Sequence, residues 1–347
     1  MTSLSAIDRA KNMNRIISII SDVLSLYGYS EIFLPIYEYY DVLADKTFNF
    51  KDENIIRFID RNTGKSLVLR PDFTPQVCRI VANYLSDMPL PIRLSYSGRV
   101  FRNVGIHKGM KSEKYQVGGE LFGADEESGD LELLLIVKRV MNRLKIDNYK
   151  IVIGDKRFLN ILSNFIDIQP LLKILESKNY SEMEIYLKNL PQDSGIYDLI
   201  SYLPDAFGGL GVLDNIYSLS NFSETLKERV LYLKGIIEKF IEMGGDIDKV
   251  VFDVSETRGL NYYTGINFDI ISIDNGNLLG GGGRYDKLME KFGYGITAAG
   301  VAFNVEEILS LIGVDKYIDE NMVFIDQGKS IKVAEKLRDE SVKVFFK

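Results

Sequence analysis

The chain has 347 residues and a net charge of −7, and 46% of its residues are hydrophobic while 26% are charged. These values predict an ordinary packed globular protein. No run of about 18 apolar residues occurs, which argues against a transmembrane helix, and the N-terminus lacks the pattern of a secretory signal. The acidic balance counts against a dedicated nucleic-acid binder, because such proteins normally carry a basic face.

The sequence contains one cysteine, Cys78, and one histidine, His107. A single cysteine rules out an intrachain disulfide, and so few cysteine and histidine side chains argue against a zinc enzyme. We therefore expect no metal site and no cofactor. A reducing cytoplasm is the expected compartment.

The N-terminal half mixes helix and strand patterns. Apolar residues at helical spacing predict a helix over residues 4–27 that ends at Gly28. The segment 29–38 is rich in β-forming residues, but the proline at position 35 indicates a strand end, a bulge or an edge. Further patterns predict a hairpin formed by residues 55–59 and 66–70, and longer strands at 93–102 and 115–122. Helices are predicted at 73–85 and 127–144.

The C-terminal half opens with short helices and polar turns from about 156 to 243, so we expect a helical insert at about 160–245. Strands return at 249–254 and 265–273, and the glycines at 280–283 predict a tight turn beside a ligand pocket. Residues 319–347 are predicted to be a truncated remnant of a C-terminal α/β domain, after a main domain at 1–318. Long antiparallel strands flanked by helices indicate an α+β fold.

Four segments, in this order, carry a specific family resemblance. They are GYSEIFLPIYE at 28–38, LRPDFTPQ at 69–76, RLSYSGRVFRN through KYQVGGELFG at 93–123, and TRGLNYYTG with GGGGRYDKL at 257–288. Together they resemble class II aminoacyl-tRNA synthetases, and histidyl-tRNA synthetase in particular, over roughly residues 5–310. The resemblance implies the antiparallel class II sheet and a dimer interface near Pro35.

The resemblance also implies a pocket for histidine. A free amino acid needs carboxylates for its ammonium group, a cation or amide for its carboxylate, and polar partners for its side chain. The positions that match the family's pocket are Asp72, Thr74, Arg102, Gln116, Glu120, Arg258, Tyr262, Tyr263 and Tyr285. Gln116 and Glu120 lie four apart on one predicted strand and so share a face. Strand alternation is expected to turn Tyr262 and Tyr263 to opposite faces, with Tyr263 toward the ligand.

Groups that would bind ATP are replaced. The family's FR-x-E signature is FRNV here, so Val104 stands in place of the acid, and Met110 stands where the resemblance implies a phosphate-facing arginine. In GVAFNVEEIL, at 300–309, Asn304 replaces a glycine and Glu307 replaces an arginine. A carboxylate at a phosphate clamp removes an attractive contact and repels the ligand. No catalytic residue is therefore expected.

A synthetase-like chain without the ATP clamp, and with only a remnant after residue 318, resembles a family of histidyl-tRNA synthetase paralogues, the regulatory subunits of ATP phosphoribosyltransferase. This resemblance implies a non-catalytic subunit in the first step of histidine biosynthesis. Its implied partners are the short-form catalytic subunit, histidine as ligand, and a second copy of the chain. It would be needed for activity and for feedback inhibition, through differential affinity of histidine for two states of the complex.

Two other functions stay open at this stage. One is a divergent but active histidyl-tRNA synthetase, which Glu307 and the expected lack of an anticodon domain oppose. The other is a histidine- or tRNA-sensing binding protein, which the acidic balance disfavours because tRNA binding requires a basic surface. The sequence also leaves open whether histidine would occupy the pocket or a subunit interface.

Overall fold

A computed structural model gives the coordinates of the protein. It describes residues 6–43, 52–103, 112–177, 179–191, 195–253, 262–313, 322–325, 336 and 343–346. No helix within these ranges is long and apolar enough to cross a membrane.

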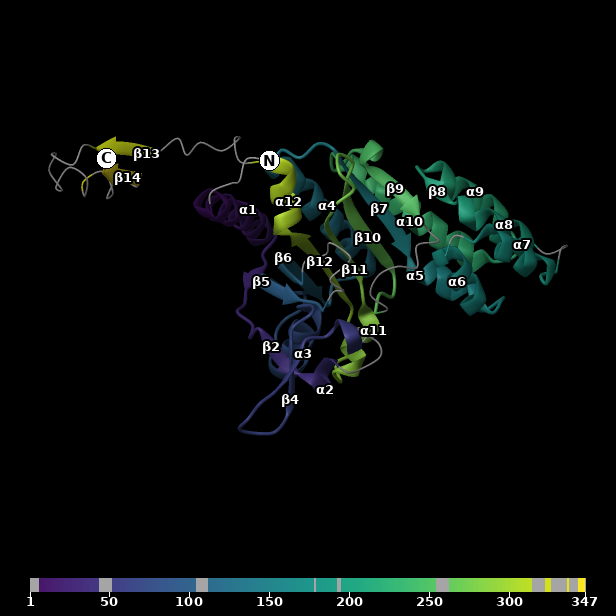
Figure 1. Ribbon diagram of the computed structural model, residues 1–347. Helices are drawn as coiled ribbons and strands as arrows, with labels where there is room; N and C mark the ends of the chain where they lie inside the picture. The colour runs from purple at the N-terminus through teal and green to yellow at the C-terminus, as the bar shows by residue number, and fades with distance from the viewer. Residues whose placement is uncertain are drawn as a thin grey trace.

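The described residues form a nine-stranded sheet at the centre of the molecule (Figure 1). Its strands, in spatial order, are β1 (Ser30–Glu31), β5 (Ile92–Phe101), β6 (Glu113–Phe122), β12 (Ala298–Asn304), β11 (Leu278–Arg284), β10 (Ile266–Ser272), β7 (Tyr149–Asp155), β9 (Val250–Asp253) and β8 (Phe207–Gly208). The run from β5 to β7 is antiparallel, whereas β1 joins β5 and β9 joins β7 in parallel. The predicted α+β fold with an antiparallel sheet is confirmed, and it has parallel pairs toward both edges.

One face of the sheet is covered by α1 (Ala6–Leu26), α4 (Glu126–Leu144) and α12 (Val305–Ile312). The buried side chains of α1 recur at helical spacing, as an amphipathic helix requires. Val117 and Leu121 of β6 join this core. Because strand side chains alternate between faces, the even-numbered residues of β6 point to the opposite face of the sheet.

A smaller core lies on that opposite face. It is formed by α3 (Thr74–Tyr84), α11 (Asp286–Lys291) and side chains of β5 such as Leu94 and Tyr96. Cys78 is fully buried in it. Beside it lies a three-stranded antiparallel sheet in the order β2 (Tyr37–Tyr39), β4 (Ser66–Leu69), β3 (Arg57–Ile59), next to the short α2 (Tyr40–Leu43).

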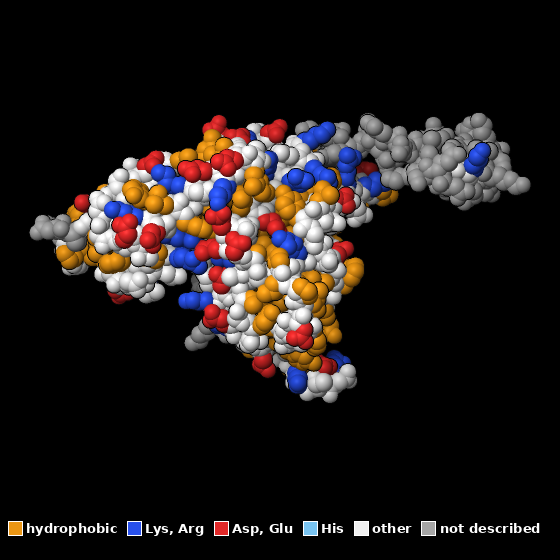
Figure 2. Space-filling model, turned by 180° about the vertical axis from the view of Figure 1, so that it is seen from behind, with side chains coloured by type: hydrophobic (Ala, Val, Ile, Leu, Met, Phe, Trp, Pro, Cys, Tyr) orange, Lys and Arg blue, Asp and Glu red, His pale blue; other side chains and the backbone are white. Residues whose placement is uncertain are grey.

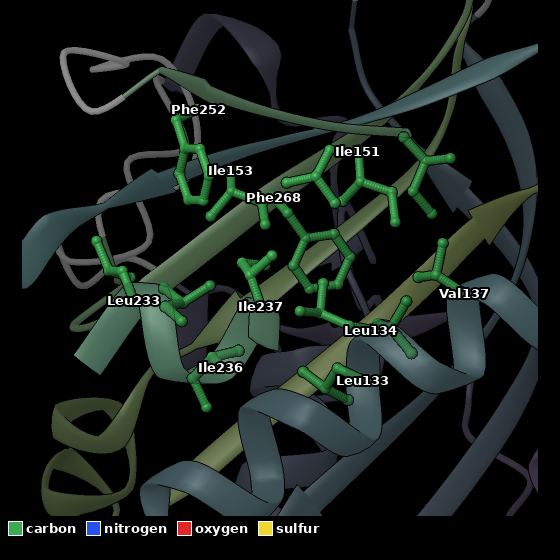
Figure 3. Close-up of a cluster of buried hydrophobic side chains, with 14 of the residues drawn as sticks. Leu133, Leu134, Val137, Ile151, Ile153, Leu233, Ile236, Ile237, Phe252 and Phe268 are labelled. Carbon is green, nitrogen blue, oxygen red and sulfur yellow. The ribbon is translucent and has the colours of Figure 1, made fainter. Parts of the chain in front are cut away.

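The chain between β7 and β9 is mainly helical. It contains α5 (Lys156–Leu162), α6 (Ile168–Ser177), α7 (Tyr180–Lys188), α8 (Gly195–Tyr202), α9 (Gly211–Leu219) and α10 (Glu224–Glu242). Figure 3 shows how α10 joins the main core: Leu233, Ile236 and Ile237 lie among side chains of α4, β7, β9 and β10. Further along, β13 (Met322–Ile325) and β14 (Lys343–Phe346) pair in parallel. The division into domains at residue 318 stays a prediction.

The glycine run departs from the sequence prediction. Residues 280–283 belong to β11 rather than to a tight turn. A Cβ atom at Gly280 would lie 2.4 Å from the carbonyl oxygen of Ala302, and one at Gly282 would lie 2.3 Å from that of Gly300. Glycine is therefore needed here for the close approach of two backbones, which a sequence pattern cannot distinguish from a turn.

Two other segments differ from the sequence patterns. The expected strand at 29–38 is split into β1 and β2 around Pro35, which has no N–H group to donate to a ladder. Residues 149–155 form β7, which the sequence analysis does not predict. This strand lies inside the sheet between β9 and β10, with Ile151 and Ile153 in the core.

Candidate functional site

A cavity of about 450 Å³ lies on the face of the sheet to which the even-numbered residues of β6 point. Small residues of β11 and β12, namely Gly280, Gly281, Gly282, Gly300 and Ala302, form part of its lining and leave space for a ligand. The described residues that line it are Asp72, Thr74, Tyr96, Val100, Arg102, Ser112, Lys114, Gln116, Glu120, Tyr262, Tyr263, Asp269, Leu278, Gly280, Gly281, Gly282, Tyr285, Gly300, Val301, Ala302 and Asn304.

Glu120 is the most tightly held side chain of the cavity. It is 1% exposed, and within the described chain it accepts hydrogen bonds from three hydroxyl groups. Thr74 Oγ1 and Tyr96 Oη donate to Oε1 at 2.7 and 3.1 Å, and the Tyr285 hydroxyl donates to Oε2. These donors come from α3, from β5 and from the residue before α11. The carboxylate is thus fixed in direction before any ligand arrives.

Two glycines make room for this arrangement. Gly300 pairs with Glu120 across β6 and β12, and a Cβ atom at Gly300 would lie 1.8 Å from Oε2 of Glu120. A Cβ atom at Gly118 would lie 2.6 Å from the Tyr96 hydroxyl oxygen. Real Cβ atoms essentially never come within 3.0 Å of such atoms. Any other residue at these positions would displace Glu120 or its donor.

Burial controls the protonation of Glu120. Desolvation raises the pKa of its carboxyl to about 8, although the hydrogen bonds from Tyr285, Thr74 and Tyr96 lower the pKa in part. Burial also raises the pKa of Tyr285 well above 10, so that hydroxyl keeps the proton it donates. A basic ligand group with a reference pKa of about 6.5, such as an imidazole, can therefore share a proton with Glu120 near neutral pH.

A carboxylate and a guanidinium group lie next to each other elsewhere in the cavity lining. Asp72 Oδ1 accepts a hydrogen bond of 3.0 Å from the backbone N–H of Thr74, and Oδ2 lies 3.6 Å from Nη2 of Arg102. Arg102 Nε donates to the carbonyl of Pro71 at 3.1 Å. Asp72 is nearly buried, whereas the Arg102 side chain is 45% exposed. Such a pair fits a zwitterion, with an ammonium group at Asp72 and a carboxylate at Arg102.

An amide pair lies at the far end of β6. Gln116 Nε2 donates to Oδ1 of Asn304 at 3.1 Å, and Asn304 Nδ2 donates to the carbonyl of Leu278 at 2.9 Å. Asn304 thus lines the cavity and orients Gln116. Glu307, on α12, is half-buried and is not among the lining residues described here. Among those residues the cations are Arg102 and Lys114.

The structure brings together almost all of the residues that the sequence analysis selects. Eight of them line the same cavity, within the described ranges: Asp72, Thr74, Arg102, Gln116, Glu120, Tyr262, Tyr263 and Tyr285. Arg258, Val104, His107 and Met110 lie outside the described residues. The role of these side chains in binding histidine stays a prediction.

The expectation for Tyr262 and Tyr263 is corrected in one respect. Both rings line the cavity, with their centroids 5.1 Å apart. Alternation does not separate them, because both precede β10 and belong to no strand. The Tyr262 ring also meets the edge of the Tyr285 ring, with centroids 5.6 Å apart.

Sequence reasoning missed four polar residues of the cavity: Tyr96, Ser112, Lys114 and Asp269. Lys114 lies two residues before Gln116 on β6, so strand alternation could have found it. Tyr96 and Asp269 give no such signal. They are brought to the cavity by strand register, since Tyr96 pairs with Gly118 and Asp269 pairs with Gly281.

The described residues contain no group of three or more histidine, cysteine, aspartate or glutamate side chains that could hold a metal ion. With its fixed acceptors, a nearby cation and aromatic side chains in the lining, the arrangement around Glu120 has the chemistry of a binding site for a small polar molecule.

Comparisons with known proteins find a family and a fold. A family model described as histidyl-tRNA synthetase matches residues 6–308. The ATP phosphoribosyltransferase regulatory subunit of Geobacter metallireducens is 30% identical over 310 residues, 88% of this chain and 71% of the relative. That of Clostridium acetobutylicum is 31% identical over 324 residues, 90% of this chain and 78% of the relative.

A solved structure is similar over almost the whole chain. It is the crystal structure of an ATP phosphoribosyltransferase regulatory subunit/histidyl-tRNA synthetase from Bacillus halodurans. The TM-score is 0.83 at 25% sequence identity, and the match covers 97% of this chain and 89% of the other. The class II synthetase-like fold that the motifs predict is thereby confirmed.

Proposed function

Because the chain belongs to the histidyl-tRNA synthetase family, and within it to the ATP phosphoribosyltransferase regulatory subunits, we propose that it is a non-catalytic cytoplasmic subunit that regulates a short-form ATP phosphoribosyltransferase. It binds the catalytic subunit, is required for full activity, and conveys feedback inhibition by histidine. It has no synthetase activity of its own.

The observation that carries the histidine part of this proposal is the fixed position of Glu120 beside Asp72 and Arg102. Glu120 faces the imidazole and exchanges a proton with it, since burial raises the pKa of the carboxyl to about 8. Asp72 takes the ammonium group, and Arg102 takes the carboxylate of the ligand. Tyr262 and Tyr263 enclose the bound amino acid.

The lack of adenylate chemistry rests on charge. Transfer at phosphorus depends on cations that clamp the phosphates. Arg102 and Lys114 are the cations among the described lining residues, and the family's motif 3 arginine is replaced by Glu307. Within the described part of the cavity a nucleoside triphosphate would therefore meet two cations, and the carboxylate at position 307 would repel its phosphates where the family has an arginine.

Self-association through residues near Pro35 is part of the same proposal. Side chains there are apolar and exposed: Phe33 is 88%, Ile36 53% and Tyr37 49% exposed. Phe58 and Ile59 of β3 are also exposed, and hydrophobic side chains gather over this part of the molecule (Figure 2). A contiguous apolar surface of this kind is typical of a protein interface. We call residues Phe33, Ile36, Tyr37, Tyr39, Phe58 and Ile59 the apolar face.

The decisive experiment adds the purified chain to a purified short-form catalytic subunit and follows phosphoribosyl-ATP formation with and without L-histidine. The proposal expects activity to rise on mixing and histidine then to suppress it. A Glu120→Gln variant should still raise activity but should lose the response to histidine. Glu132→Gln, which removes a carboxylate bound to Arg93 outside the cavity, is the matched control and should behave as the wild type.

Two results would contradict the proposal. A catalytic subunit that is fully active and histidine-sensitive alone, with no change on mixing, would remove the regulatory role. Histidine-dependent exchange between ATP and pyrophosphate by the purified chain would show that it is an active synthetase instead.

A further inference from the structure

The first turn of α3 touches both the cavity and the apolar face. On the cavity side, Thr74 donates to Glu120 at 2.7 Å. Two residues later in the same turn, Gln76 is 1% exposed, and its Nε2 donates to the carbonyls of Pro35 and Tyr37 at 3.2 Å each. Gln76 Oε1 is buried without a hydrogen-bond partner among the described residues. Strand β2 and the site thus share one rigid element.

Arg70 makes a second connection to the same segment. It is 3% exposed, and its Nη1 donates to the carbonyls of Leu34 and Pro35 at 3.0 and 3.1 Å. Its Nε donates to the carbonyl of Arg99 on β5 at 2.8 Å. No carboxylate forms an ion pair with Arg70 among the described residues, and burial lowers the pKa of its guanidinium to about 10. Arg70 thus donates hydrogen bonds to three backbone carbonyls. A lysine ammonium group lacks the planar guanidinium geometry that reaches all three at once.

From Arg70 a stack of rings leads into the cavity. The guanidinium lies over the Phe73 ring at 3.8 Å, and that ring stacks on Tyr96 with centroids 4.1 Å apart and planes 11° apart. Tyr96 donates to Glu120 at 3.1 Å. The backbone at Gly98 packs closely against these side chains. A Cβ atom at Gly98 would lie 2.6 Å from Nη2 of Arg70 and 3.2 Å from the Phe73 ring. Because these groups are in direct contact, we expect a shift of residues 34–37 to move the stack, and a shift of the stack to move residues 34–37.

We propose that Arg70 and Gln76 are positioning residues that couple self-association through the apolar face to ligand binding in the cavity. The inference rests on the proposed function, since it takes histidine as the ligand and a second copy as the occupant of the apolar face. Histidine binding and self-association both order the first turn of α3 and residues 34–37. Whichever occurs second therefore has a smaller conformational-entropy cost. Histidine thus strengthens self-association, and self-association strengthens histidine binding by the same factor.

The test measures two quantities: the effect of histidine on self-association and the effect of self-association on histidine affinity. Sedimentation gives the self-association constant with and without saturating L-histidine, and calorimetry gives histidine affinity below and above the self-association concentration. Wild-type protein should show reciprocal effects of about 5- to 150-fold. Arg70→Lys and Gln76→Met should still bind histidine and still associate, but with a factor near one. Arg139→Lys, which also removes a guanidinium lying over a ring, that of Tyr27, should keep the wild-type factor.

The possible outcomes separate this inference from the function it rests on. Histidine binding by the wild type without any effect on association would overturn the coupling and leave the proposed function intact. Coupling that survives in both variants would also overturn it. If the wild type binds no histidine, the proposed function fails as well. Should thermal scans show that Arg70→Lys does not fold, Gln76→Met decides the question, because it keeps the side-chain volume and removes only the amide contacts.

Discussion

The Thr74 hydroxyl donates a hydrogen bond of 2.7 Å to Oε1 of Glu120, and this contact joins the first turn of α3 to β6. Forty-six residues separate the two in sequence. The same carboxylate also accepts from Tyr96 and Tyr285. Glu120 is therefore the point at which side chains from three separate parts of the chain meet.

Glu120→Gln should weaken histidine binding by at least about tenfold, or about 1.4 kcal/mol, because a carboxyl group that can exchange a proton with the imidazole is replaced by an amide that cannot. The fold should persist, since glutamine has the same shape and the three hydroxyl groups can reorient. Calorimetry with L-histidine measures the loss, with Glu132→Gln as control. Equal affinities in the wild type and Glu120→Gln would rule out a role for this carboxylate in binding.

Stability should depend on pH through Glu120. Its pKa is raised by burial from 4.5 in the unfolded chain to about 8 in the folded chain, so the folded state binds the proton more tightly. The stabilising contribution is fully present below about pH 4.5 and is lost as the pH rises through about 8. The difference in melting temperature between Glu120→Gln and the wild type should therefore grow, in favour of the variant, from pH 5 to about pH 8 and then level off. A difference that is constant over this range would refute the assignment.

Gly300→Ala should both destabilise the fold and abolish histidine binding. The new Cβ would lie 1.8 Å from Glu120 Oε2 and 3.0 Å from the carbonyl oxygen of Gly119, so Glu120 must move at a cost of about 1–3 kcal/mol. Gly235→Ala is the matched control: nothing lies within 4 Å of its Cβ on α10, and a gain of about 0.5–1 kcal/mol is expected. Urea denaturation measures the free energy of unfolding of both variants, which should fall for Gly300→Ala and rise for Gly235→Ala.

Arg284→Met should be among the most destabilising changes. Arg284 is 1% exposed, and its Nε and Nη1 bind Asp130 and Asp286 at 2.9 and 3.0 Å. Removing the cation leaves Asp130 buried without it, which costs about 3–5 kcal/mol. Arg99→Met breaks an ion pair with Glu113 whose two side chains are 51% and 42% exposed, and should cost about 0–1 kcal/mol. Similar midpoints in urea for the two variants would contradict this reasoning.

Phe33→Asp should weaken self-association without unfolding the chain. The side chain is 88% exposed, so its replacement costs the single chain little, whereas a carboxylate inside an apolar interface is strongly unfavourable. Sedimentation at several protein concentrations measures the effect. As control, Tyr84→Asp replaces another exposed aromatic residue, 74% exposed at the end of α3. An unchanged association constant in Phe33→Asp would exclude this face.

Sequence periodicity predicted most elements close to their observed bounds. Helix α1 was expected at 4–27 and is found at Ala6–Leu26, and the helix expected at 127–144 is found at Glu126–Leu144. These elements are governed by repeats of 3.6 or 2 residues and by end signals such as Gly28, which lie within the segment itself. Strand β7 was missed, because it lies inside the sheet and its pattern also fits other interpretations.

By itself the sequence determined the fold class, the family and eight of the residues that line the cavity, because motif order and strand alternation are properties of the chain alone. Only the tertiary structure decided that Glu120 is held by Thr74, Tyr96 and Tyr285, that the glycine run is a strand, and that Asp269 joins the cavity. These facts depend on strand register and on distances between atoms far apart in sequence. Such contacts form when packing brings backbones within van der Waals range, and no local pattern specifies them.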